Sequence, residues 1–158
     1  MNTSIIVAKS HAENGAFIFK RAFSHIPDDK LSWSPSETAK SALRIAAHIG
    51  LTNQGFASMI RGNNSPFGSV NELLKMLDEK ERGYTTKDAA LALVDASLNE
   101  VLSAIESLTP DQLATEVKTA FAPLPIGKIM MMPGSHMLLH AGQIEYLQTI
   151  WGDTDAYR

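Results

Sequence analysis

Residues 133–152, PGSHMLLHAGQIEYLQTIWG, form the stretch on which the interpretation of the whole chain depends. The stretch is predicted to be the last helix, closing at its tryptophan and glycine. Its start has two possible positions, because proline restricts the backbone ahead of it. Either the helix begins near Pro125 and is kinked at Pro133, or Pro133 itself occupies the first turn. Both alternatives place His136 and His140 inside the helix.

His136 and His140 stand four residues apart, so a helix puts both on one face with their β-carbons about 5–6 Å apart. Imidazole nitrogens suit zinc, nickel, copper and iron, whereas calcium and magnesium prefer carboxylates, and no carboxylate stands at a matching position. The pair lacks the intervening glutamate of the zinc-protease motif, and such pairs also arise by chance. The spacing therefore makes a transition-metal site possible without establishing it.

His48 is the best candidate for a third ligand. It lies in an otherwise aliphatic stretch, residues 45–49, where a buried imidazole needs a partner; the alternative is a core histidine that is hydrogen-bonded locally. His11 lies among polar residues, and His25 stands at a helix end, where it suits the helix dipole. Gln143 projects from the same side of the helix as the histidine pair, where it could hydrogen-bond to a ligand or bind substrate. The alternative is a partly buried glutamine at a helix interface.

Capping signals and apolar periodicity predict an all-α chain. The predicted helices cover residues 3–24; from the capping box Ser34-Pro35-Ser36-Glu37 to Met59-Ile60; from Ser69-Val70-Asn71-Glu72 to Arg82-Gly83, with Gly83 as cap; and from Thr85 or Thr86 to Thr109-Pro110, where a further single turn can begin. No stretch has the pattern of a strand flanked by turn residues. The prediction is a single helical domain, residues 1–158, with four long helices and one short helix between the second and third.

Composition narrows the function. The net charge of -3 and the lack of a Lys/Arg cluster give no footprint for nucleic acid. The chain has no cysteine, which excludes disulfides, thiolate ligands and a cysteine nucleophile. No stretch is long and apolar enough for a membrane span or a signal peptide, so a cytoplasmic location is expected. The run Met130-Met131-Met132 is interpreted as packing.

Three segments together carry a family resemblance: residues 26–35 (IPDDKLSWSP), the helix with His48, and residues 136–144 (HMLLHAGQI). In this combination the chain resembles the DinB/YfiT-like proteins. The resemblance implies a four-helix bundle, usually dimeric, with a divalent metal (Zn, Ni or Fe) held by His48, His136 and His140. One departure is Pro133-Gly134, where the family has an uninterrupted helix, so a kinked or loosened approach to the site is expected.

The resemblance leaves the reaction open, since some members look like bacillithiol S-transferases, others resemble mycothiol-dependent isomerases, and many have no assigned reaction. Three neutral ligands leave the ion an open position for water or a thiol. The expected function is metal-dependent transfer of a small cellular thiol to an electrophilic substrate, with a hydrolase or a non-catalytic metal- or ligand-binding bundle as alternatives. Glu145 lies about 140° round the helix from His140, a poor place for a hydrolytic base. The expected partners are a small-molecule substrate and a second copy of the chain.

Overall fold

The computed structural model describes residues 2–155. Its elements, in chain order, are α1 (Thr3–Ser24), the 3-10 turn η1 (Asp28–Lys30), α2 (Ala42–Ile60), α3 (Val70–Glu81), α4 (Lys87–Glu106), the 3-10 turn η2 (Pro110–Ala114), β1 (Glu116–Lys118), β2 (Pro123–Pro125), α5 (Ile126–Ile129) and α6 (Met132–Ile150). The prediction of four long helices with one short helix between the second and third is confirmed. None of the described helices is both long and apolar enough to cross a membrane.

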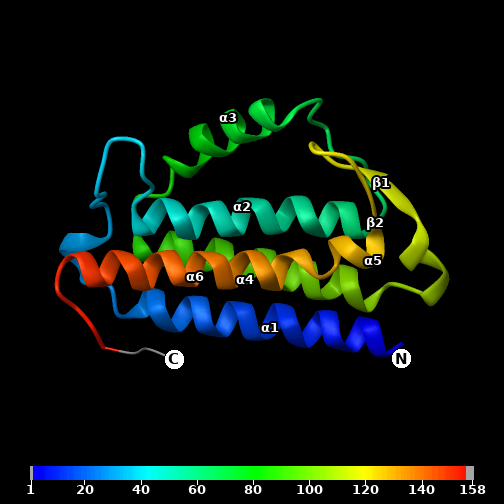
Figure 1. The fold of residues 1–158 in the computed structure, drawn as a ribbon, viewed down its shortest axis with the longest axis horizontal. Coiled ribbons are helices and arrows are strands. Elements are labelled where there is room, and N and C mark those ends of the chain that lie inside the picture. Colours follow the sequence, from blue (N-terminus) through cyan, green and yellow to red (C-terminus); the bar gives the residue numbers. More distant parts are fainter. Residues whose placement is uncertain (1, 156–158) are drawn as a thin grey trace.

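The four long helices α1, α2, α4 and α6 lie side by side along the long axis of the molecule, and α3 is set outside α2 (Figure 1). Helix α1 packs against α4 and α6, and α2 packs against the same two helices. The apolar positions of α1 recur at helical spacing and are all buried, as the periodicity predicts: Ile5, Ala8, Ala12, Ala16, Phe19 and Phe23. These side chains form one core between the four helices.

Helix α6 begins as the second alternative predicted, with Pro133 in its first turn, where the missing N–H of proline costs no helical hydrogen bond. The residues after Pro125 form the separate short helix α5. Met130 is 2% exposed in the core, and Met131 and Met132 pack against the core, which confirms the packing interpretation of this run.

The helix is interrupted ahead of the histidine pair, since Met130 and Met131 separate α5 from α6, but the expectation that Pro133-Gly134 loosens the approach is wrong, because the contact is tight. Gly15 and Gly134 are both buried where α1 meets α6. A β-carbon added to Gly15 would lie 2.6 Å from the carbonyl oxygen of Gly134, and one added to Gly134 would lie 2.6 Å from that of His11. Two glycines therefore allow the backbones of α1 and α6 to approach directly ahead of His136.

The predicted start of the second helix at Ser34 is wrong: α2 begins at Ala42, with Ser41 as its N-cap. The Ser34 hydroxyl contacts the carbonyl oxygens of Ser36 and Ala39, both at 2.8 Å. Such local bonds from serine to the backbone compete with helix formation, so the capping-box residues form a loop. The caps Ser69 and Thr86 are confirmed. Arg82 caps α3, and Gly83 has no positive φ, so its predicted capping role is wrong.

The prediction of no strands is also wrong, because β1 and β2 form a small antiparallel ladder that pairs Glu116 with Pro125 and Lys118 with Pro123. Each strand has three residues, too few to show alternation in a sequence. The ladder fastens the loop after α2, since the N–H of Ser65 donates to the carbonyl oxygen of Lys118 at 2.7 Å.

Candidate metal centre

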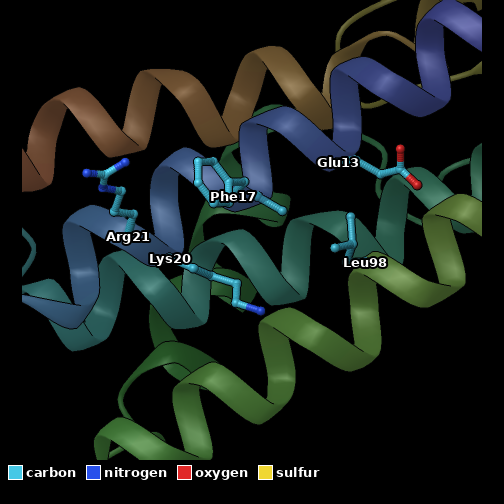
Figure 2. A pocket seen from close by; sticks show the side chains of 6 residues that line it. Glu13, Phe17, Lys20, Arg21 and Leu98 are labelled. Atoms are coloured by element: carbon cyan, nitrogen blue, oxygen red, sulfur yellow. The ribbon is translucent and has the colours of Figure 1, made fainter. Parts of the chain in front are cut away.

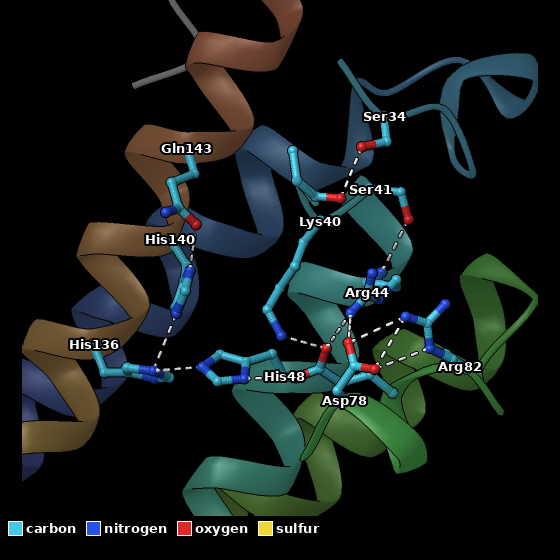
Figure 3. A network of polar contacts seen from close by, with 12 residues as sticks. Ser34, Lys40, Ser41, Arg44, His48, Asp78, Arg82, His136, His140 and Gln143 are labelled. Carbon is cyan, nitrogen blue, oxygen red and sulfur yellow. Dashed lines mark hydrogen bonds and ion pairs between the residues drawn. The ribbon is translucent and has the colours of Figure 1, made fainter. Parts of the chain in front are cut away.

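Helices α2 and α6 bring the three predicted histidines together. His48 comes from the middle of α2, and His136 and His140 come from successive turns of α6. The Nε2 atom of His136 lies 3.2 Å from Nε2 of His48 and 3.0 Å from Nε2 of His140. Figure 3 shows the three rings converging on one point between the two helices. Among the described residues these histidines form a group whose ligand atoms could hold one metal ion.

Hydrogen bonds at the far side of two rings set the direction of the lone pairs. The Nδ1–H of His48 donates to Oε1 of Glu81 at 2.8 Å, and the Nδ1–H of His140 donates to Oε1 of Gln143 at 2.7 Å. A neutral imidazole that carries its proton on Nδ1 has a lone pair on Nε2. His48 and His140 therefore both aim lone pairs at Nε2 of His136.

The nitrogen spacing fits a transition metal. Zinc–nitrogen bonds of about 2.0–2.1 Å at tetrahedral angles place ligand nitrogens about 3.3–3.4 Å apart, and octahedral right angles bring them to about 3.0 Å. The observed separations of 3.0 and 3.2 Å lie close to these values. The donor set of three imidazoles suits zinc, nickel or iron and does not select among them.

The surroundings keep two of the histidines neutral. Burial lowers the pKa of His136 to about 3, with further lowering by the neighbouring His140 and His48. Burial also lowers the pKa of His140 to about 4, against the opposing effect of its bond to Gln143. Since a metal ligand must be deprotonated, both rings are ready to bind an ion at neutral pH.

Glu81 is the site residue that sequence reasoning missed. Its side chain is 0% exposed, and besides His48 its carboxylate contacts Lys40, and Arg44 at 3.4 Å. Burial would raise the pKa of this carboxyl, but hydrogen bonds from His48 and Lys40 outweigh burial and hold the pKa below its usual value. The site therefore has a carboxylate behind one ligand. One pattern in the sequence could have pointed to Glu81: it stands four residues after Leu77, the other buried residue of α3, and so lies on the same face of the helix.

The far side of the His136 ring differs from the other two. Its Nδ1 atom is buried without a hydrogen-bond partner among the described residues, as are Oγ1 of Thr52 and Oδ1 of Asn53 on α2. The ring meets the edge of the Phe56 ring, with centroids 5.7 Å apart. His136 is therefore held by packing, whereas His48 and His140 are held by polar partners.

The remaining candidates lie outside this cluster. His11 contacts the Ser135 hydroxyl at 3.0 Å, and His25 is the C-cap residue of α1, at the helix end where it was predicted to stand. Two surface hollows lie away from the histidines: one between α1 and α4, lined by Glu13, Phe17 and Leu98 among others (Figure 2), and one on α6 that includes Glu145. Neither hollow includes a histidine of the cluster.

Comparison with known proteins decides the family. The DinB superfamily matches residues 18–144, most of the chain. The chain belongs to the DinB superfamily. The predicted resemblance is thereby confirmed.

This DinB superfamily chain is similar to one curated protein in sequence and to two solved structures in fold. It is 29% identical over 124 residues to the uncharacterized protein YjoA of Bacillus subtilis (strain 168), covering 75% of this chain and 72% of YjoA. The crystal structure of the DinB-like protein YjoA from Bacillus subtilis matches with a TM-score of 0.63 at 21% identity, over 99% of each chain. The mycothiol-dependent maleylpyruvate isomerase matches with a TM-score of 0.74 at 17% identity, over 91% of this chain and 63% of the isomerase. At these identities the two structures establish the shared fold alone.

Proposed function

We propose that this chain binds one divalent transition-metal ion through Nε2 of His48, His136 and His140. The observation that carries the proposal is that Nε2 of His136 lies 3.2 Å from Nε2 of His48 and 3.0 Å from Nε2 of His140, while Glu81 and Gln143 fix the Nδ1–H of the other two rings. Nε2 of His136 can carry one proton and donate it toward only one of the two facing lone pairs, so the other lacks a donor from His136 unless a cation lies between them. A bound cation satisfies all three nitrogens together.

The bound ion would serve a reaction, and we infer that the reaction uses a small cellular thiol. An ion held by three neutral ligands keeps a position for an exchangeable ligand and lowers the pKa of a water molecule or thiol bound there. The chain has no cysteine, so any thiol must come from a cofactor. A structural neighbour, the maleylpyruvate isomerase, is mycothiol-dependent, which supports a thiol cofactor here.

Hydrolysis is the alternative, since the ion would activate bound water as well as a thiol, and Glu81 is poorly suited to assist it as a base. The oxygens of Glu81 are engaged by His48 on one side and by Lys40 and Arg44 on the other. A carboxylate held by three donors, with a lowered pKa, is a weak proton acceptor. Lowering the pKa of the bound group supplies the nucleophile in either reaction, so the preference for a thiol rests on the mycothiol-dependent structural neighbour.

The test is turnover of an electrophilic substrate, such as an activated aryl chloride, with a panel of low-molecular-weight thiols. The zinc- or nickel-loaded protein should accelerate loss of the chloride with at least one thiol, and His140→Ala should lose most of that rate. His25→Ala is the matched control, a histidine outside the cluster, and should retain the wild-type rate. Equal rates for wild type and His140→Ala would refute the thiol reaction. Metal binding without any metal-dependent turnover would favour a non-catalytic metal-binding bundle.

A further inference from the structure

Helix α3 has little apolar attachment to the bundle. Of its 12 residues, Leu77 and Glu81 are the buried ones, and Leu74 is 52% exposed. Figure 1 shows α3 diverging from α2 over most of its length. An isolated helix of this length is marginal in water. The contacts at its C-terminal end therefore decide whether α3 stays in place.

Those contacts are ionic and centre on Glu81. The carboxylate is the most deeply buried charged group of the helix, and its partners Lys40, Arg44 and His48 lie on α2 or just before it (Figure 3). Its two oxygens have separate roles, since Oε2 contacts the two cations and Oε1 accepts the Nδ1–H of His48. Lys40 and Arg44 would suffice to balance the negative charge of Glu81. The bond from Oε1 is therefore the one that bears on the histidine cluster.

We propose that Glu81 is a positioning residue of the three-histidine site, which fixes His48 in its Nδ1–H form and couples the docking of α3 to occupancy of the site. The inference rests on the proposed metal binding. A cation at Nε2 of His48 makes its Nδ1–H a stronger donor to Glu81, and a docked Glu81 makes Nε2 a better ligand. Thermodynamic linkage requires these two effects to be equal. The free energy by which bound metal stabilises the docked position of α3 should therefore equal the free energy by which docking of α3 strengthens metal binding.

The test uses Glu81→Gln with Asp78→Asn as matched control. Asp78 is on the same helix, and among the described residues it contacts Arg44 and Arg82 but no histidine. A glutamine at position 81 can satisfy only one side: with its oxygen toward Lys40 and Arg44, its NH2 group faces Nδ1 of His48. That arrangement favours the proton on Nε2, where it blocks metal binding.

Affinity for Zn²⁺, measured by competition with a chromophoric chelator, should fall about 10–100-fold in Glu81→Gln and less than about 3-fold in Asp78→Asn. Hydrogen exchange of the α3 amides should slow on addition of Zn²⁺ in wild type and Asp78→Asn, but not in Glu81→Gln. Equal affinities in the two variants, or exchange in α3 that ignores Zn²⁺ in wild type, would overturn the coupling.

A measurement on the wild type guards against misfolding of Glu81→Gln. Long-range ¹H–¹⁵N correlation spectra should place the proton of His48 on Nδ1 with and without Zn²⁺, and a proton on Nε2 in the metal-free protein would overturn the proposal. If wild type binds no Zn²⁺, the proposed metal site itself is refuted, which is a different outcome from equal affinities in the variants.

Discussion

Replacing Gly134 by alanine should destabilise the bundle by an amount that the α1–α6 contact sets. The new β-carbon would lie 2.5 Å from Cδ2 of His11 and 2.6 Å from its carbonyl oxygen. An ordinary contact begins near 3.4 Å, so the helices must separate by about 0.8 Å. Overpacking of this kind costs about 1–3 kcal/mol, against a gain of up to about 1 kcal/mol from alanine's helix propensity. The expected net loss is about 1–2 kcal/mol.

Gly142→Ala is the matched control, because Gly142 lies on the same helix with nothing within 4 Å of its added β-carbon. That variant should gain about 0.5–1 kcal/mol. Urea unfolding of the metal-free proteins at neutral pH measures both changes. In thermal unfolding the midpoints of the two variants should differ by about 3–12 °C, since about 1 kcal/mol shifts the midpoint of a domain of this size by about 2–4 °C. If the two variants change stability by the same amount, the close approach of α1 and α6 at Gly134 is refuted.

Three further predictions concern the histidines. The pKa values of His136 and His140 are about 3 and 4 in the folded chain, below the value of 6.5 for an ordinary histidine. As the pH falls through 6.5, these two side chains therefore bind protons in the unfolded chain but not in the folded chain. The metal-free protein should therefore lose about 1–3 kcal/mol of stability between pH 7 and 5.5 in urea titrations, and a flat profile would contradict these values. Because His136 and His140 are already neutral, Zn²⁺ binding at pH 5.5 should release at most about one proton per ion from the three rings. The number released is the slope of the logarithm of Zn²⁺ affinity against pH. A slope near three would show that all three rings must first lose a proton. Gln143→Leu removes the acceptor for Nδ1–H of His140 and should weaken Zn²⁺ binding about 10-fold, whereas Gln54→Leu, an exposed glutamine on α2, should not; equal affinities would deny Gln143 its role.

Residue spacing and apolar periodicity along the sequence were enough to predict much of the fold. The i, i+4 spacing of His136 and His140 is a property of one helix, so any helical structure for that stretch brings them together. His48 was identified because an imidazole on an aliphatic face needs a partner, and that partner proved to come from other helices. Periodicity likewise located the buried face of α1.

The errors arose where tertiary contacts or local competition decide. Glu81 lies 33 residues from His48, and only the packing of α3 on α2 brings the two together. The Ser34 capping box failed because the hydroxyl is used within a loop. Pro133-Gly134 does follow a break between α5 and α6, but the approach is not loosened, because the glycine admits the backbone of α1.

Elemental analysis of protein purified without a histidine tag tests the central claim most directly. The claim predicts about one equivalent of zinc, nickel or iron per chain, present on purification or restored by adding the ion, and lost in His136→Ala. Wild-type protein with less than about one-tenth of an equivalent, unrestored by added zinc or nickel, would contradict it.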